Sequence, residues 1–228
     1  MAALQSILYK YRELYAGVLD ETPATFKLKG SWFENICLYF FKNDLFYKQR
    51  YDKVWLWIDW PDRKDRPDTG IDLVARRRED GKFCAIQCKF YESEYSVSKA
   101  DIDTFLAASG KEGFVERIIV STADKWNKNA EDTIQGQQIP CNRLTLEALE
   151  QSRIDWTEFD IGNPQKIKYL PNRELRDYQD MAVNNVINSF QEQNRGKMIM
   201  ACGTGKTFTA LKIAEKIAGA GKTILYLV

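Results

Sequence analysis

The pattern of hydrophobic and polar residues predicts two helices at the start of the chain and a mixture of strands and helices after them. The helices are expected at about 3–18 and 31–43, the second beginning after Gly30 with Ser31 as its cap. The next predicted elements, in chain order, are strands at 51–57, 71–77 and 82–91, a helix at 99–109, a strand at 115–121, a helix at 126–134, a strand at 139–144 and a helix at 145–151. The Asp-Gly pair at 80–81 indicates a hairpin between the second and third strands. This part of the chain is expected to form an α/β fold, a mixed central sheet flanked by helices.

The C-terminal part shows a different order of elements. The pattern predicts a helix at about 174–193, a strand at 197–201, a glycine-rich turn, a helix at 206–218 and a strand at 223–228. This order corresponds to one βαβ unit preceded by a helix.

A change of charge separates the two parts. Residues 166–228 hold 10 Lys and Arg and 5 Asp and Glu, which leaves 23 of the 33 basic and 27 of the 32 acidic residues for the first part. The polar, turn-rich residues 160–166 lie at the change and are typical of a linker. We therefore predict two domains, 1–165 and 166–228.

The absence of histidine restricts the chemistry more than any other feature of the composition. Histidine is the commonest metal ligand and the side chain that titrates near neutral pH, so Ser-His-Asp hydrolases, Cys-His proteases and histidine-dependent zinc enzymes are excluded. The 5 cysteines form no C-x-x-C pair, which argues against a zinc site and a disulfide framework. No apolar stretch approaches the ~20 residues that span a bilayer, and no secretory signal is present, so we expect a cytoplasmic protein without membrane contact.

Residues 203–207, Gly-Thr-Gly-Lys-Thr, follow an apolar predicted strand and begin an amphipathic predicted helix. Glycines at 203 and 205 allow backbone N–H groups to surround a phosphate. Lys206 can reach β and γ oxygens, and the Thr207 hydroxyl can bind Mg²⁺. Upstream, Gln179 lies 24 residues before Gly203 and offers both a donor and an acceptor to an adenine edge. These residues together predict a nucleotide site.

The segment Ala201 to Thr207 resembles the Walker A variant of superfamily 2 helicases and translocases, and Leu175 to Gln179 resembles their Q motif. The resemblance implies a RecA-like P-loop domain. The ATP-binding residues that it implies are Gly203, Thr204, Gly205, Lys206, Thr207, Gln179 and, stacking on adenine, Arg176. Such motors also need a second lobe, a Walker B acid and arginine fingers, so we expect a partial RecA-like βαβ unit of a longer protein that by itself binds ATP weakly at best and does not hydrolyse it.

The first part carries a second constellation, on the strands joined by the hairpin. Alternate residues of a strand share a face, so Gln87 and Lys89 point together, and the hairpin can bring Asp72 beside them. A carboxylate, an amide oxygen and an ammonium suit Mg²⁺-assisted phosphodiester hydrolysis. Asp68 competes for the acidic role, but Asp72 lies inside the strand pattern. The alternative for Asp72 and Lys89 is an ordinary surface ion pair.

These residues resemble the PD-(D/E)xK nuclease superfamily, in particular its Mrr-like restriction endonuclease branch, which has D…QxK where other members have D…ExK. That family also has a supporting glutamate on the preceding helix, and Glu34 occupies its place. The resemblance implies a restriction-endonuclease-like fold with Glu34, Asp72, Gln87 and Lys89 in the active site. The implied ligands of Mg²⁺ or Mn²⁺ are Asp72, Gln87 and the main-chain carbonyl of Cys88.

An Mrr-like nuclease followed by a superfamily 2 motor resembles single-polypeptide, ATP-dependent restriction enzymes of the Type I-like and Type ISP kind. The resemblance implies an endonuclease that cleaves double-stranded DNA and a motor that uses ATP in the full-length protein. It also implies methyltransferase and target-recognition domains downstream and a possible dimer of nuclease domains at cleavage. The alternative is a catalytically inactive, nuclease-like module that docks an ATP-driven helicase on DNA.

Overall fold

The computed structural model of the chain describes residues 3–16, 23–64, 70–110, 113–159, 168–171, 174–201, 203–219 and 222. The chain folds into two compact units, Met1–Leu170 and Pro171–Val228, each of which is described here by itself. Residues 168–170 belong to the first unit because Asp155 and Leu170 form backbone hydrogen bonds with Lys168 and Arg153, respectively. The boundary predicted at about 165 lies slightly earlier, in a segment outside the described residues.

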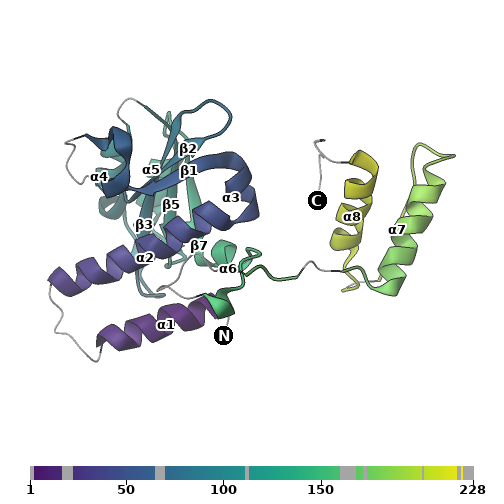
Figure 1. The fold of residues 1–228 in the computed structure, drawn as a ribbon, viewed down its shortest axis with the longest axis horizontal. Coiled ribbons are helices and arrows are strands. Elements are labelled where there is room, and N and C mark those ends of the chain that lie inside the picture. The colour runs from purple at the N-terminus through teal and green to yellow at the C-terminus, as the bar shows by residue number, and fades with distance from the viewer. Residues whose placement is uncertain are drawn as a thin grey trace. The chain divides into compact units, whose positions relative to one another are not determined.

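The predicted elements of the first unit occur in the predicted order, with three further short elements at Leu45–Arg50, Ser96–Val97 and Lys125–Trp126 that the sequence analysis did not predict (Figure 1). They are α1 (Ala3–Ala16), α2 (Pro23–Asn43), α3 (Leu45–Arg50), β1 (Tyr51–Leu56), the 3-10 turns Trp57–Asp59 and Pro61–Arg63, β2 (Leu73–Arg77), β3 (Phe83–Lys89), β4 (Ser96–Val97), α4 (Lys99–Ser109), β5 (Phe114–Ser121), β6 (Lys125–Trp126), α5 (Lys128–Gln135), β7 (Cys141–Thr145), α6 (Leu146–Glu150) and the 3-10 turn Trp156–Glu158.

The central sheet is mixed, as the sequence predicted, with the strand order β1-β2-β3-β5-β7. Strands β1, β2 and β3 are antiparallel, whereas β5 and β7 continue from β3 in parallel. The hairpin between β2 and β3 forms at the predicted Asp-Gly pair, where Gly81 has a φ of +69°. Strand β3 is therefore a central strand, with an antiparallel neighbour on one side and a parallel neighbour on the other.

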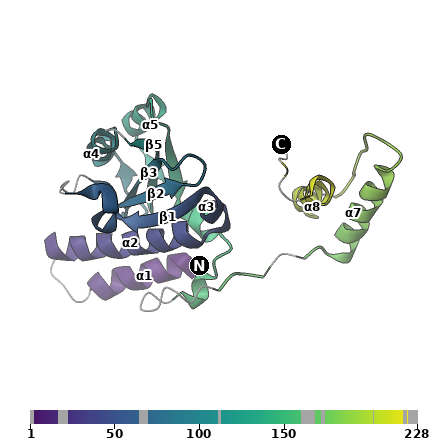
Figure 2. The same ribbon diagram turned by 45° about the horizontal axis from the view of Figure 1, so that its top comes forward.

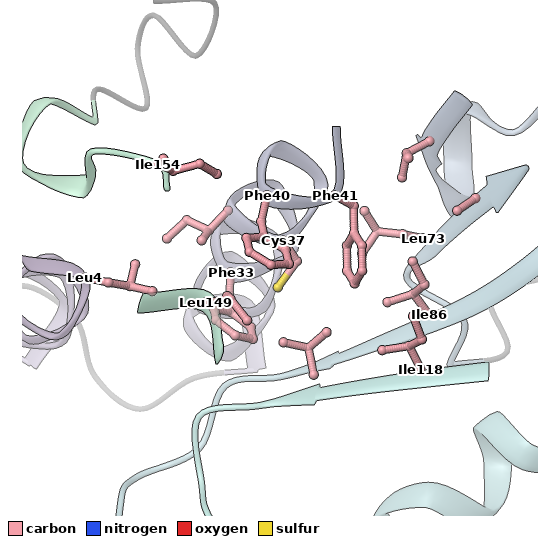
Figure 3. Close-up of a cluster of buried hydrophobic side chains, with 14 of the residues drawn as sticks. Leu4, Phe33, Cys37, Phe40, Phe41, Leu73, Ile86, Ile118, Leu149 and Ile154 are labelled. Atoms are coloured by element: carbon pink, nitrogen blue, oxygen red, sulfur yellow. The ribbon is translucent and has the colours of Figure 1, made fainter. Parts of the chain in front are cut away.

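Two hydrophobic cores cover the two faces of this sheet. Helices α1 and α2 pack on one face, and α4 and α5 on the other, as Figure 2 shows. On the α2 face, Phe33, Cys37 and Phe41 pack against strand residues that include Leu73 and Ile86 (Figure 3). Alternate residues of β3 enter opposite cores, Ile86 the first and Ala85 the second. Both faces are covered, which fixes β3 in the middle of the unit.

The predicted start of the second helix at Ser31 is wrong, because α2 begins at Pro23 and runs through Gly30. Proline is favoured in the first turn of a helix. A single glycine inside a helix costs only about 1 kcal/mol, so the Gly30-Ser31 pair does not end it. Among the described residues, no helix is both long enough and apolar enough to cross a membrane.

The second unit contains α7 (Asp177–Ser189) and α8 (Lys206–Ala218), which pack together through Val183 and Ile213 among others. The predicted strand at 197–201 is wrong, since these residues form no strand. A strand is maintained by hydrogen bonds to a neighbour, and no strand is present in the described part of this unit. The strand predicted at 223–228 lies outside the described residues.

Candidate active site

Asp72 lies one residue before β2, where the ladder between β2 and β3 ends. Its N–H donates to the carbonyl of Ile86 at 2.9 Å, and its Oδ2 accepts from the N–H of Cys88 at 2.6 Å. The Asp72 carboxylate thus serves as the acceptor for a β3 N–H group at the point where the backbone ladder between β2 and β3 ends. The structure therefore brings Asp72 directly beside residues 87–89, as the hairpin prediction required.

Gln87 has a buried side chain whose two amide atoms differ in their surroundings. Its Nε2 donates to the carbonyl of Gly70 at 3.0 Å. Its Oε1 is buried and has no hydrogen-bond partner, although the side chain is only 3% exposed. Because buried polar atoms are normally paired, an orphaned amide oxygen indicates an acceptor position that a ligand can fill.

Lys89 and the carbonyl of Cys88 lie at the carboxyl end of β3. The carbonyl of Lys89 accepts from the N–H of Thr122 at 3.0 Å, so this residue bonds toward β5. In a strand, the N–H and C=O of one residue point to the same side and neighbouring residues alternate. The Cys88 carbonyl consequently points, like its N–H, toward Asp72. The Lys89 side chain is half-buried.

Glu34 lies on α2 directly after Phe33, whose ring stacks on that of Phe90, the residue after β3, at a centroid distance of 5.5 Å. The turn of α2 that carries Glu34 therefore lies near the carboxyl end of β3. Burial raises the pKa of the Cys88 thiol, and Cys37 and the negative charges of Asp72 and Glu34 raise it further. The Glu34 side chain is half-buried.

Near the carboxyl end of β3 the chain offers oxygen atoms of the type that a hard divalent cation prefers. They are the carboxylate oxygens of Asp72 and Glu34, the unpaired Oε1 of Gln87 and the main-chain carbonyl of Cys88. In the described part of the chain, no group of three or more Asp, Glu, Cys or His side chains is placed to hold a metal. A resident ion would therefore depend on the Gln87 amide and the main-chain oxygen as well as on carboxylates.

Asp68, the competing acid, falls outside the described residues. Two arginines of β2 are engaged by carboxylates, since Arg76 pairs with Asp52, and Arg77 pairs with Glu79 at 2.7 Å. These pairings reduce the positive charge that the hairpin could offer to a phosphate backbone.

The glycine-rich turn of the second unit has a backbone conformation that favours glycine and leads directly into a helix. Gly203 and Gly205 have φ angles of +76° and +78°, and α8 begins directly after them at Lys206. The Lys206 ammonium donates to the carbonyl of Ala201 at 3.2 Å. Thr207 is the second residue of α8 and is exposed. The N–H groups of the first helical turn are thus directed at the loop.

Gln179 and Arg176 lie against this loop. The Gln179 Nε2 donates to the carbonyl of Thr204 at 2.9 Å, and its Oε1 accepts from the N–H of Arg176 at 3.0 Å. Each bond uses one donor hydrogen or one lone pair, so the amide keeps one of each. Arg176, Gln179 and loop residues 203–205 line a pocket of about 380 Å³. The tertiary structure brings the two distant motifs into one site.

Comparisons with known proteins agree with the geometry of the first unit. The profile of the family described as "Restriction endonuclease" matches residues 42–166, more than half of the chain. The chain belongs to the restriction endonuclease family. A second profile, described as "Type III restriction enzyme, res subunit", matches residues 172–228. The restriction endonuclease domain and a helicase-like fragment therefore follow one another, as the two sequence motifs indicated.

The solved structure of the "ATP-dependent Type ISP restriction-modification enzyme LlaBIII bound to DNA" matches this restriction endonuclease at 38% identity with a TM-score of 0.71. The match covers 86% of this chain and 12% of that enzyme, so the chain spans a small part of its length. The "MspJI Restriction Endonuclease in Complex with 27-mer Oligonucleotide" matches with 18% identity and a TM-score of 0.42. This match covers 64% of this chain and 30% of that one. No curated protein sequence matches the chain.

The sequence analysis missed Gly70, whose carbonyl orients the Gln87 amide. Its φ of +79° is in the left-handed region that favours glycine. A glycine two residues before a candidate acid was the available signal. The analysis also missed Thr122, which fixes the Lys89 carbonyl, and no local pattern marks that residue because it is brought there by the parallel pairing of β3 with β5.

Proposed function

We propose that the first unit is a metal-dependent endonuclease that hydrolyses phosphodiester bonds of double-stranded DNA. The observation that carries the proposal is the buried, unpaired Oε1 of Gln87, one residue before Cys88, whose N–H donates to the Asp72 carboxylate. Such an arrangement provides oxygen donors without a histidine or a third carboxylate. The described match to an enzyme bound to DNA supports DNA as the substrate.

The residues of this chain have separate roles in the proposal. Asp72, the Gln87 Oε1 and the Cys88 carbonyl would hold Mg²⁺ or Mn²⁺, with Glu34 supporting them from α2. When bound, the ion would polarise the scissile phosphate and lower the pKa of a water molecule. Lys89 would orient the attacking water, accept its proton or stabilise the negative charge that develops on the phosphate. The Gly70 carbonyl keeps the Gln87 oxygen turned to the ligand.

We further propose that the second unit binds ATP, with loop residues 203–207 around the phosphates and Gln179 and Arg176 at the adenine. The shared pocket and the left-handed glycines support this assignment. In the full-length protein this unit would belong to a motor that translocates on DNA, followed by methyltransferase and target-recognition domains. The whole enzyme would act in the cytoplasm, and two nuclease domains could meet at cleavage.

Plasmid nicking with Mg²⁺ or Mn²⁺ tests the nuclease proposal. Supercoiled DNA is incubated with the wild-type chain, with Asp72→Ala and Lys89→Ala, and with Asp103→Ala as a control at a partly exposed acid of α4 that pairs with Lys99. We expect nicking by wild type and by the control, and its loss in both site variants. The same variants are then placed in the full-length protein with ATP.

The alternative, a catalytically inactive module that docks a helicase on DNA, predicts a different outcome. In that case the wild type and both site variants are equally inert, even in the full-length protein, while DNA binding persists. A Mn²⁺ titration of the wild type and of Asp72→Ala separates the two proposals further. The nuclease proposal expects Asp72→Ala to bind Mn²⁺ more weakly than the wild type does, whereas the docking proposal expects no difference between them.

A further inference from the structure

Helix α1 lies outside residues 42–166, the segment that the restriction endonuclease profile matches, yet it contacts the segment that directly follows the strand carrying Lys89. The contact is made by Arg12, whose side chain is 25% exposed. Leu4 and Leu8, on the same helix, are buried in the core shared with α2. Helix α1 is therefore firmly packed, and Arg12 extends from a fixed position.

Arg12 contacts three consecutive residues that follow Lys89. Its guanidinium lies over the ring of Phe90, 5.0 Å from the centroid. It donates to the carbonyl of Tyr91 and pairs with the carboxylate of Glu92 at 3.5 Å. A planar guanidinium can make all these contacts at once, which an ammonium cannot do equally well. The Arg12 side chain thus contacts all three residues that follow β3.

The same segment is tied to β5 on its other side. The N–H of Tyr91 donates to the Thr122 hydroxyl at 2.8 Å, and that hydroxyl donates back to the Tyr91 carbonyl at 2.6 Å. The N–H of Thr122 donates to the Lys89 carbonyl at 3.0 Å. Arg12 and Thr122 therefore share the Tyr91 carbonyl, and a shift at either is transmitted to the backbone of Lys89.

Phe90 links the same contact to α2. Its ring stacks on Phe33 at a centroid distance of 5.5 Å and meets the edge of Trp32 at 6.0 Å. These two residues directly precede Glu34. Phe90 therefore contacts both Arg12 and the turn of α2 that presents Glu34. One aromatic ring thus directly follows Lys89 in the chain and packs against the two residues that precede Glu34.

We propose that Arg12 is a positioning residue of the nuclease site, which holds the end of β3 and the Glu34 turn of α2 in the geometry that binds the metal. The proposal rests on the proposed metal-dependent function. It assigns to α1 a role in catalysis, beyond packing. Replacing a residue that orients a metal ligand typically changes metal affinity about 10- to 100-fold. Arg12 acts on the proposed ligands through neighbouring residues, so a smaller effect is expected. We expect Arg12→Ala to weaken Mn²⁺ binding by about three- to tenfold.

Three measurements on the 228-residue chain test the proposal. Calorimetry gives the Mn²⁺ affinity, plasmid nicking gives the dependence of rate on Mn²⁺ concentration, and hydrogen exchange of the metal-free chain gives the protection of the amides at residues 89–92 and 122. The variants are Arg12→Ala, Arg12→Lys, Asp72→Ala and, as a matched control, Lys10→Ala at an exposed position of the same helix. We expect Arg12→Ala to lose protection from hydrogen exchange at these amides and to need a higher Mn²⁺ concentration for the same nicking rate. Arg12→Lys should lie between Arg12→Ala and the wild type in both measurements.

The outcomes separate this proposal from the function on which it rests. If Asp72→Ala binds Mn²⁺ as wild type does, the proposed metal site fails, whatever Arg12 does. If Arg12→Ala matches Lys10→Ala in Mn²⁺ affinity and in nicking rate, the positioning role is overturned, even if hydrogen exchange at residues 89–92 and 122 becomes faster. Should Arg12→Ala not fold, Arg12→Gln and Glu92→Gln are judged by the same criterion, since Glu92 is 76% exposed and its replacement leaves the core intact.

Discussion

The Nε2 of Gln87 donates to the main-chain carbonyl of Gly70 at 3.0 Å, and this bond decides which end of the amide remains for a ligand. A β-carbon on Gly70 would come within 3.3 Å of the same nitrogen, and the φ of Gly70 is +79°. The glycine therefore allows its carbonyl to approach the amide closely. With the nitrogen held in this way, the oxygen is the atom left unpaired.

Replacing Gln87 by Glu tests the role of this bond. A carboxylate oxygen would then face the Gly70 carbonyl, and two acceptors so close repel each other unless the new carboxyl holds a proton. We expect Mn²⁺ affinity to fall by roughly tenfold at neutral pH, because a protonated carboxyl lacks the charge that attracts the ion, and a charged one faces the Gly70 carbonyl without a hydrogen bond, at a cost of about 1–3 kcal/mol.

The new carboxyl would have a raised pKa, so it carries its charge only at higher pH and Mn²⁺ binding recovers as the pH rises. Calorimetry between neutral and alkaline pH measures this recovery. Gln135→Glu, at an exposed position of α5, is the matched control. Tighter binding of Mn²⁺ by Gln87→Glu at neutral pH would contradict the assignment of the Gly70 carbonyl.

Asp72→Asn separates the charge of this residue from its structural bond. An asparagine oxygen can still accept the N–H of Cys88, so the free energy of unfolding should change by less than about 1 kcal/mol. The lost charge should lower the rate of DNA cleavage by at least about 100-fold, because a charge that stabilises the reacting group is lost. Urea denaturation and plasmid nicking give the two quantities. A folded Asp72→Asn that nicks at the wild-type rate excludes Asp72 from the site.

The Asp101 side chain is expected to make a pH-dependent contribution to the free energy of unfolding. Burial tends to raise its pKa, but hydrogen bonds from the N–H and hydroxyl of Ser98, and from Tyr95 and Tyr91, outweigh burial and lower it. A lowered pKa means that the stabilisation is present above the unfolded pKa of about 3.9 and is lost as the pH falls through the folded value.

Asp101→Ala should therefore lose about 1–2 kcal/mol at pH near 7, which is the typical cost of removing a helix-capping group. The difference from wild type should shrink below a pH of about 4. Urea denaturation at both pH values measures it, with Asp103→Ala, a partly exposed acid of the same helix that pairs with Lys99, as the control. A difference that grows toward acid pH is the contrary result.

Gly205→Ala should disable the proposed nucleotide site. A β-carbon there would lie 2.6 Å from the Gln179 Nε2, and the φ of +78° costs an alanine about 1–2 kcal/mol. We expect binding of a fluorescent ATP analogue to weaken at least about tenfold. Gly196→Ala is the control, because its β-carbon would meet only Phe190, at 3.7 Å. Equal binding by the two variants would count against the assignment.

Local patterns were sufficient for most elements of the first unit. The helix predicted at 99–109 is α4, and the Asp-Gly pair forms the β2–β3 hairpin. These features depend on caps, turns and periodicity within a few residues. The start at Ser31 was wrong because the packing of α2 on the sheet outweighs a local glycine signal. The strand at 197–201 was wrong because a strand requires a partner that local sequence does not provide.

For the candidate site, the sequence by itself determined which residue types are available: two carboxylates, an amide and a lysine, without histidine. The alternation of β3 also determined that Gln87 and Lys89 share a face. Only the tertiary structure decided that the Asp72 carboxylate bonds to Cys88, that the Gly70 carbonyl turns the Gln87 amide, and that Arg12 reaches Tyr91 from α1. Such contacts join residues far apart in the chain, and they form only when the sheet and both of its helical layers are packed together.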